Sequence, residues 1–291
     1  MDWEERVGRI RQWRKDGKRA PHKPLLLLYA LGHHQRHGDA PILYSAAEEH
    51  LRLLLDEFAP PTRSGTTPAY PFRRLANDDG LWLLTTDDGG DPGDNAGRLR
   101  GSGARGNLTP EFSRALSDDP GLRTRIARAL LDANFPSSLH EEILALAGLA
   151  LTDGRRVAAH DRDPRFREAV LDAYGHRCAF CGYEGRLGGV PVGLEAAHVR
   201  WWSHAGPDDV DNGLALCSNH HLLFDRGVLG LTGELTLDVS PRFEARSAEA
   251  ERIVTDLAGR DLLLPATAPS VAAGHVDWHR REVFKDPGLA A

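Results

Sequence analysis

The sequence predicts an α+β protein: a mainly helical N-terminal domain with a small β element, followed by a C-terminal domain organised around a cluster of cysteines and histidines. Apolar residues recur at helical spacing through the first 150 residues. All three cysteines fall within the 40 residues from Cys178 to Cys217. A chain of 291 residues with 41% hydrophobic content is long enough for two domains, each with its own core.

An amphipathic helix is predicted for residues 2–15, where apolar side chains recur every three or four positions and Gly17 ends the pattern. The segment 6–23 is also strongly basic. In it, Asp16 alone opposes a set of basic side chains, namely Arg6, Arg9, Arg11, Arg14, Lys15, Lys18, Arg19 and Lys23. These charges form a candidate phosphate-binding surface, and a solvated helix face is the alternative.

A second helix is predicted to begin at Pro24 and reach about His37, because the apolar run after Pro24 is too dense for a surface helix. His22 and Lys23 therefore lie near a helix N-terminus. Backbone N–H groups and the helix dipole favour an anion at such a place.

The rest of the N-terminal domain, which we assign to residues 1–150, is predicted from capping and turn signals. Capping boxes at Ser45-x-x-Glu48 and Ser138-x-x-Glu141 open two helices, and Pro60-Pro61 ends the first. The other predicted elements are a loop at 62–77, a strand at 81–86, a mobile loop at 87–106 and a helix at 121–133.

A polar linker is predicted at residues 151–163, followed by the C-terminal domain at 164–291. Its predicted elements outside the cysteine-rich segment are helices at 164–174, 248–257 and 276–284 and a hairpin at 230–238.

Composition excludes several classes of protein. No apolar run approaches the roughly 18 residues of a membrane span, and the acidic start of the chain is unlike a signal peptide. The grouped cysteines also argue against a secreted disulfide framework, so a cytoplasmic protein is expected. The net charge of −6 argues against a uniformly basic surface, although a local basic patch is compatible with it.

Two close pairs of ligands, Cys178-x2-Cys181 and Cys217-x2-His220, have the spacing of a tetrahedral structural zinc site. Four protein ligands leave no open coordination position. The zinc is therefore expected to hold the fold and not to take part in a reaction.

Three motifs in the same region resemble the HNH endonuclease family with its ββα-metal fold. They are 194–198 (LEAAH), 212–217 (NGLALC) and 220–227 (HHLLFDRG). The resemblance implies that His198, on the first strand, is the general base that activates water. It implies that Asn212 holds His198 in position and that His221 binds a divalent ion, Mg²⁺ or Mn²⁺.

One position departs from the family pattern. Many members have a second metal ligand directly before the general base, where this chain has Ala197. Asp225, four residues after His221 on the same helix face, could supply the missing oxygen, or could instead form a cap or pair with Arg226. Glu195 is the other candidate ligand, but strand alternation points it away from His198.

Two N-terminal motifs, 20–29 (APHKPLLLLY) and 70–75 (YPFRRL), are similar to the sulfur-binding domain of McrA-like type IV restriction endonucleases, which recognise phosphorothioate-modified DNA. The resemblance implies a shallow pocket formed by Tyr70 and Pro71, with His22 and Lys23 facing the negative charge. Sulfur is larger and less hydrated than oxygen, so it tolerates an apolar wall. The family has a small residue where this chain has Arg74, whose methylenes would then form the wall.

Within this scheme, Lys15 and Arg19 are expected to contact phosphate, and the loop 98–105 could reach base edges. An ordinary turn packed on the core is the alternative interpretation of Tyr70-Pro71. The paired Trp201-Trp202 is expected to pack the loop after His198, with a contact to DNA as the alternative.

The predicted function is a restriction endonuclease that binds double-stranded phosphorothioate DNA and cuts nearby. A nuclease that reads another modification, such as methylcytosine, and a zinc-stabilised DNA-binding protein without catalysis are the alternatives. Because one HNH site cuts one strand, two chains acting together as a homodimer are expected.

Overall fold

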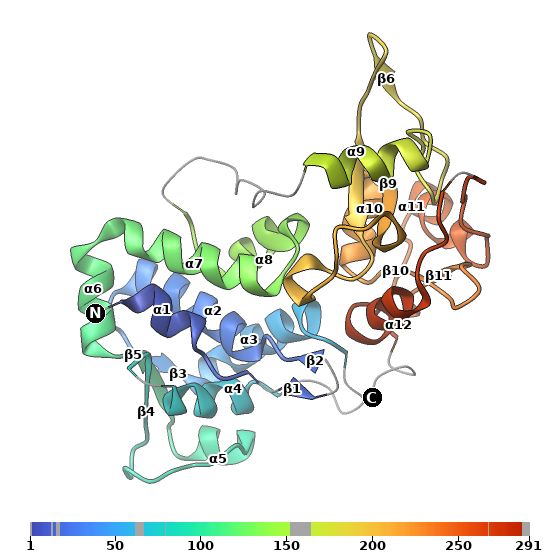
Figure 1. Ribbon diagram of the computed structural model, residues 1–291. Helices are drawn as coiled ribbons and strands as arrows, with labels where there is room; N and C mark the ends of the chain where they lie inside the picture. The colour runs from blue at the N-terminus through green and yellow to red at the C-terminus, as the bar shows by residue number, and fades with distance from the viewer. Residues whose placement is uncertain are drawn as a thin grey trace. The chain divides into compact units, whose positions relative to one another are not determined.

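The structure is a computed structural model that describes residues 2–12, 14–15, 18–61, 67–78, 80–151, 164–266 and 268–286. The chain divides into two compact units (Figure 1). One contains Met1–Ala59 and Ser64–Ala158, and the other contains Pro60–Arg63 and Ala159–Ala291. The linker predicted at 151–163 lies, apart from Leu151, outside the described residues.

Helix α2 (His22–His37) forms the centre of the first unit. Its residues from Leu25 to Leu28 are at most 1% exposed, because this part of the helix is apolar on all sides and α2 packs against several other helices. The buried helix predicted in this region is confirmed, although it begins at His22 and not at Pro24.

Other helices of the first unit contribute to this core. They are α1 (Trp3–Gly8), α3 (Tyr44–Phe58), α4 (Ala69–Arg74), α5 (Ala96–Gly101), α6 (Pro110–Asp118), α7 (Pro120–Asn134) and α8 (His140–Ala147), with short 3-10 turns η1 (Leu75–Asn77) and η2 (Ser137–Leu139). The predicted mainly helical domain is therefore confirmed.

The small β element is a three-stranded antiparallel sheet in the order β3 (Ile42–Leu43), β5 (Arg105–Leu108) and β4 (Trp82–Thr85). Gly106 lies in the central strand under the indole of Trp82, and a Cβ atom there would come within 1.9 Å of the ring. The indole Nε1 of Trp82 donates a hydrogen bond to the carbonyl of Phe72 at 2.9 Å, which ties the sheet to α4.

Several sequence predictions in this unit were wrong. The first helix ends at Gly8 and not near residue 15, and a short hairpin of β1 (Arg14–Lys15) and β2 (Lys18–Arg19) follows it. Ser45 does not cap α3, whose N-cap is Leu43, and Ser138 does not cap α8. The loops predicted at 62–77 and 87–106 contain α4 and α5, and β5 starts within the second.

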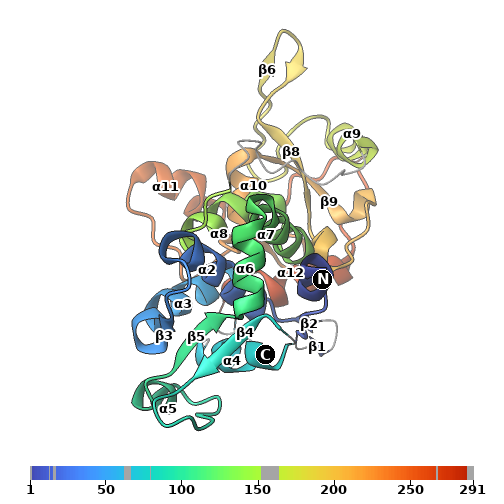
Figure 2. The same cartoon turned by 90° about the vertical axis from the view of Figure 1, so that its left-hand side faces the viewer.

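The second unit places a β-hairpin and a helix in direct succession. Strands β8 (Leu194–His198) and β9 (Gly213–Cys217) pair antiparallel, with Leu194 opposite Cys217 and His198 opposite Gly213 (Figure 2). Helix α10 (Ser218–Asp225) begins immediately after β9. This order of strand, strand and helix is the predicted ββα arrangement.

The second unit contains further elements, some of which pack into its hydrophobic core. They are α9 (Pro164–Ala173), β6 (Arg186–Leu187), β7 (Val190–Pro191), β10 (Leu229–Leu231), β11 (Leu237–Val239), α11 (Ala248–Ile253), the 3-10 turn η5 (Thr255–Leu257) and α12 (Ala273–Glu282). The side chains of Val170 and Leu214 are fully buried in this core. The predicted hairpin and all three predicted helices are present within a few residues of their expected bounds.

None of the described helices is both long and apolar enough to cross a membrane.

Candidate functional site

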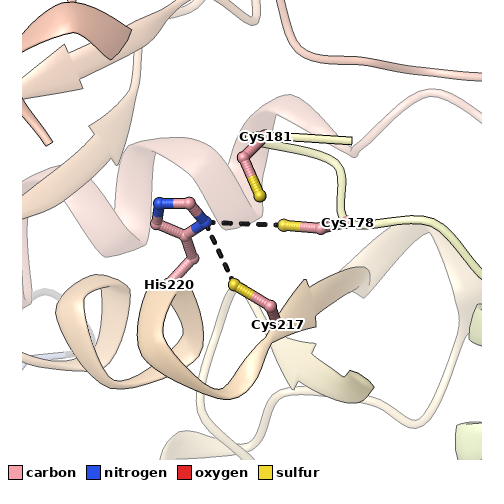
Figure 3. Close-up of side chains that lie close together, drawn as sticks. All are labelled: Cys178, Cys181, Cys217 and His220. Atoms are coloured by element: carbon pink, nitrogen blue, oxygen red, sulfur yellow. Dashed lines mark hydrogen bonds between the residues drawn. The ribbon is translucent and has the colours of Figure 1, made fainter. Parts of the chain in front are cut away.

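The four predicted zinc ligands meet in one cluster. The ligand atoms of Cys178, Cys181, Cys217 and His220 all lie within 4.8 Å of one another (Figure 3). The Nδ1 atom of His220 lies 3.6 Å from Cys178 Sγ and 3.2 Å from Cys217 Sγ. Among the described residues this is the one group of three or more cysteine, histidine or acidic side chains whose ligand atoms converge in this way.

The surroundings of His220 fix which of its nitrogens faces the cluster. Its Nε2 lies 3.0 Å from the carbonyl of Ile253, an acceptor, so Nε2 carries the hydrogen and Nδ1 presents its lone pair to the cysteines. Hydrogen bonds with Cys181 and Cys217 hold the pKa of Cys178 far below its ordinary value, which favours the thiolate that a metal requires.

The turn that carries the first two cysteines depends on a glycine. Gly182 has a φ of +73°, and its N–H donates to the carbonyl of Cys178 at 2.8 Å. The N–H of Cys178 in turn donates to the carbonyl of Tyr183 at 2.9 Å. The second pair comes from the end of β9 and the first turn of α10, so the cluster joins the turn to the hairpin and the helix.

His198 is the last residue of β8 and is 7% exposed. Its ring stacks on Phe166, with centroids 4.2 Å apart and an interplanar angle of 17°. Its Nε2 lies 2.7 Å from Oδ1 of Asp208, a residue that none of the sequence motifs contains. The two residues are ten positions apart, and Asp208 lies in the loop 199–211, whose path the sequence spacing does not reveal.

Asn212 is fully buried, and its side chain bonds to the backbone of the loop 199–211. Its Oδ1 accepts from the N–H of Arg200 at 2.8 Å, and its Nδ2 donates to the carbonyls of Arg200 at 3.0 Å and Pro207 at 2.9 Å. These bonds hold the two arms of the loop together. Asn212 is thus placed to fix the loop that follows His198 and carries Asp208.

His221 follows His220 directly but faces other partners. Its Nδ1 lies 2.6 Å from Oε2 of Glu195, and its Nε2 lies 3.1 Å from Oδ2 of Asp225. Burial acts to lower the pKa of His221, but the two carboxylates outweigh it and raise the pKa to about 9. The other carboxylate oxygen of Asp225 accepts from the indole Nε1 of Trp201 at 3.0 Å.

The surroundings of Asp225 and Glu195 bear on the two candidate ligands that the sequence left open. Asp225 is 2% exposed and contacts His221 and Trp201. Glu195 contacts His221 and Ser218, so it belongs to the surroundings of His221 and not to those of His198. Trp201 is buried, whereas Trp202 is 54% exposed.

In the first unit, Tyr70 and Pro71 lie in the first turn of α4, not in an irregular turn. The guanidinium of Arg74 lies over the Tyr70 ring, 4.3 Å from its centroid. Arg74 also donates from Nε and Nη2 to Oδ2 of Asp94, at 2.9 and 2.7 Å. The stacked guanidinium, and not only the methylenes of Arg74, therefore borders Tyr70.

His22 and Lys23 open α2, and neither is a free cation. Burial lowers the pKa of His22 to about 4, so its ring is neutral near pH 7. Lys23 forms an ion pair with Asp78, which also accepts from the backbone N–H of Arg11. The side chains of Lys15 and Arg19 lie outside the described residues.

The segment 98–105 is largely structured, and two of its arginines pair with acidic side chains. Arg100 pairs with Glu48, and Arg105 pairs with Asp87.

Comparisons with known proteins match both units. The family described as "ScoMcrA-like, DNA sulfur-binding domain" matches residues 1–152, and the family described as "HNH endonuclease" matches residues 178–232. No curated protein matches the chain.

Similar solved structures have low sequence identity. The "Sulfur binding domain of ScoMcrA complexed with phosphorothioated DNA" is 23% identical, with a TM-score of 0.40, over 52% of this chain and 99% of that chain. The "Structure of the Type IV phosphorothioation-dependent restriction endonuclease ScoMcrA" is 13% identical, with a TM-score of 0.40, over 89% of this chain and 98% of that chain. The "Modification dependent TagI restriction endonuclease" is 23% identical, with a TM-score of 0.34, over 45% of this chain and 43% of that chain. The match therefore spans less than half of that structure.

The first family match covers more than half of the chain, and the second covers the segment that contains the Cys₃His cluster, His198, Asn212 and His221. The chain therefore belongs to the family of ScoMcrA-like proteins with a DNA sulfur-binding domain, and it carries an HNH endonuclease domain.

Proposed function

We propose that this chain is a modification-dependent, type IV restriction endonuclease. In this proposal the N-terminal unit binds double-stranded DNA that carries a phosphorothioate, and the HNH site hydrolyses the backbone nearby. The observation that carries the proposal is the presence, in one chain, of a sulfur-binding family match over 1–152 and of a buried His198 beside Asp208 in the HNH segment.

A structural zinc held by Cys178, Cys181, Cys217 and His220 is part of this proposal. Three sulfurs and one imidazole are the donor set of many structural zinc sites, and the close approach of the four ligand atoms suits tetrahedral coordination. With no position left for water or substrate, this zinc would anchor the Cys178 turn to α10 and have no chemical role.

His198 would act as the general base. It would accept a proton from the water that attacks phosphorus, while Asn212 fixes the loop that follows it. The low exposure of His198 and its stacking on Phe166 favour one ring orientation, which a base needs if it is to meet the water at a fixed angle.

His221 and Asp225 would hold the catalytic divalent ion, Mg²⁺ or Mn²⁺. His221 Nε2 and Asp225 Oδ2 lie side by side at 3.1 Å, and Glu195 would retain the hydrogen on Nδ1 of the same ring. The ion, when bound, would stabilise the charge on the phosphate and on the leaving oxygen. Water and phosphate oxygens would fill the remaining positions, since Mg²⁺ is usually held by few protein ligands.

In the N-terminal unit, Tyr70, Pro71 and Arg74 would form the sulfur pocket, and His22 and Lys23 would lie near the phosphate. An apolar wall made of the Tyr70 ring and Pro71 disfavours a hydrated oxygen more than a sulfur. Arg74, already stacked on Tyr70, would supply positive charge at the edge of the pocket. His22 would act as a neutral hydrogen-bonding group and not as a cation.

Binding of DNA by Lys23 and Arg74 would alter ion pairs that both residues already form. Each already pairs with an aspartate, Asp78 or Asp94, so a DNA phosphate must replace or join that carboxylate. Lys15 and Arg19 would contact neighbouring phosphates. Cleavage of both strands would need two chains, each contributing one HNH site.

A paired binding and cleavage experiment tests the proposal. Duplexes of one sequence, with and without a single phosphorothioate, are incubated with the full-length chain and with His198→Ala, in the presence of Mn²⁺ or Mg²⁺. We expect both proteins to bind the sulfur-containing duplex preferentially and only the unsubstituted chain to cut it. Equal affinity for the two duplexes would refute the sulfur-binding role, and undiminished cutting by His198→Ala would refute the general-base assignment.

A further inference from the structure

Asp208 lies beside His198, although none of the sequence motifs described above contains it. Its Oδ1 lies 2.7 Å from Nε2 of His198. An ionised carboxylate only accepts hydrogen bonds, so the hydrogen between them belongs to Nε2. In the neutral ring, the other nitrogen, Nδ1, is then the basic one.

The loop that carries Asp208 is built to hold it in place. The side chain of Asn212 links the carbonyl of Pro207, directly before Asp208, to the backbone of Arg200, two residues after His198. Gly206 lies so close to the carbonyl of Arg200 that a Cβ atom on it would come within 1.8 Å of the oxygen. Its N–H donates to the carbonyl of Trp201 at 3.0 Å.

The ring of His198 is constrained from a second side. Phe166 of α9 stacks on it nearly parallel, and the ring is 7% exposed, whereas the Asp208 side chain is 33% exposed. The carboxylate therefore remains partly hydrated beside a buried imidazole. An isolated imidazole would be free to carry its hydrogen on either nitrogen, and a fixed carboxylate selects one of them.

We infer that Asp208 is a positioning residue for this nuclease, and that His198 and Asp208 work as a dyad. Asp208 holds the hydrogen of His198 on Nε2 and so presents Nδ1 as the proton acceptor. Asn212 acts indirectly, by fixing the loop that brings Asp208 to His198. The inference rests on the proposed function of His198 as the base, but the tautomer that it assigns is measurable without any cleavage.

During the reaction, water would lose a proton to Nδ1 as its oxygen bonds to phosphorus and the bond to the leaving oxygen breaks. The ring would then be positively charged, with hydrogens on both nitrogens. The Asp208 carboxylate would stabilise this charge at 2.7 Å, an interaction that is stronger in the transition state than with the neutral ring.

The test combines spectroscopy and kinetics on the full-length zinc-loaded chain. Histidine ¹⁵N shifts in ¹⁵N-labelled protein report which ring nitrogen carries the hydrogen, and a His198→Gln variant assigns the signals. We expect His198 to carry its hydrogen on Nε2 in the unsubstituted chain and to lose this preference in Asp208→Ala. We also expect kcat for cleavage to fall by at least about tenfold, and by no more than the roughly 10²–10⁴-fold that a general base supplies, while DNA affinity is retained.

Asp209→Asn is the matched control, because Asp209 is the exposed neighbour that bonds to Asn212 only through its backbone carbonyl. It should leave the His198 signals and kcat unchanged. Zinc content and thermal unfolding verify that each variant is folded. A His198 tautomer that is the same in the unsubstituted chain and in Asp208→Ala would overturn the inference, even if activity fell. A tautomer that changes as expected in a chain that cuts no DNA would leave the dyad standing and refute the proposed function.

Discussion

At the scale of single residues, His279 is a buried group whose protonation opposes folding. It is 1% exposed, stacks on Phe224 with centroids 3.7 Å apart, and donates from Nε2 to the carbonyl of Phe224 at 3.0 Å. Burial lowers its pKa to about 4, against 6.5 for an exposed histidine. Between these pH values the unfolded chain binds the proton and the folded chain does not.

Stability should therefore fall as the pH drops from about 6.5 to 4, and should be insensitive to His279 above that range. The full difference is about 3 kcal/mol of unfolding free energy. His279→Gln keeps a donor for the carbonyl of Phe224 but cannot be protonated. Thermal unfolding at pH 7 and pH 5 should show a smaller loss of stability for the variant than for the unsubstituted chain. An equal loss in both proteins would show that His279 does not contribute.

The candidate site was predictable where its residues follow one another at short spacing. Cys178-x2-Cys181 and Cys217-x2-His220 are local patterns, and the four side chains converge. Asp208 was missed because its approach to His198 depends on how the loop 199–211 folds back. The engagement of Lys23 by Asp78 and of Arg74 by Asp94 was missed for the same reason, since those partners lie 55 and 20 residues away.

At the scale of elements, the predictions succeeded for helices with a long apolar run and failed where polar residues dominate. The dense apolar run of α2 was sufficient to predict a buried helix. In contrast, α5 was predicted as a loop, because its segment is rich in Gly, Asp and Arg and has no periodicity. The capping box predicted at Ser45-x-x-Glu48 is absent, because Glu48 forms an ion pair with Arg100 and does not cap α3. Tertiary contacts determine the structure of these two segments, and such contacts cannot be inferred from the spacing of residues along the chain.

The contact between Gly106 and Trp82 makes the small sheet sensitive to one methyl group. In Gly106→Ala, the new Cβ atom would require the indole to move, and the indole is bonded to the carbonyl of Phe72 in α4. We expect a loss of about 1–3 kcal/mol in unfolding free energy, measured by denaturant titration, because overpacking strains a filled core.

Gly101→Ala provides the comparison, since a Cβ atom there meets no neighbour within 4 Å. It should change the stability by less than about 0.5 kcal/mol. If Gly106→Ala were as stable as Gly101→Ala, the indole would have room to move, and the sheet would not constrain α4.

At the scale of the whole molecule, the two units have separate cores, and only the second contains the Cys₃His cluster. Removal of zinc by a chelator, or the substitution Cys217→Ser, should destabilise the second unit and abolish cleavage. Binding of phosphorothioate DNA by the first unit should persist. Calorimetry should show that the midpoint temperature of one unfolding transition falls and that the midpoint temperature of the other is unchanged.

Gel shifts and metal analysis on the same samples complete this experiment. About one zinc per chain is expected before treatment, and restoring zinc to the chelated protein should restore cleavage. Loss of DNA binding together with zinc would contradict the independence of the two units.

His220 and His221 are joined by one peptide bond, yet the first faces the cysteines and the second faces Glu195 and Asp225. This adjacency gives the nuclease site a natural spectroscopic reporter. Cobalt(II), placed at the Cys₃His cluster, is coloured and paramagnetic, and would shift the NMR signals of the neighbouring imidazole strongly. Titration of Mg²⁺ or DNA into the cobalt form would then reveal occupancy at His221 without a label and without turnover.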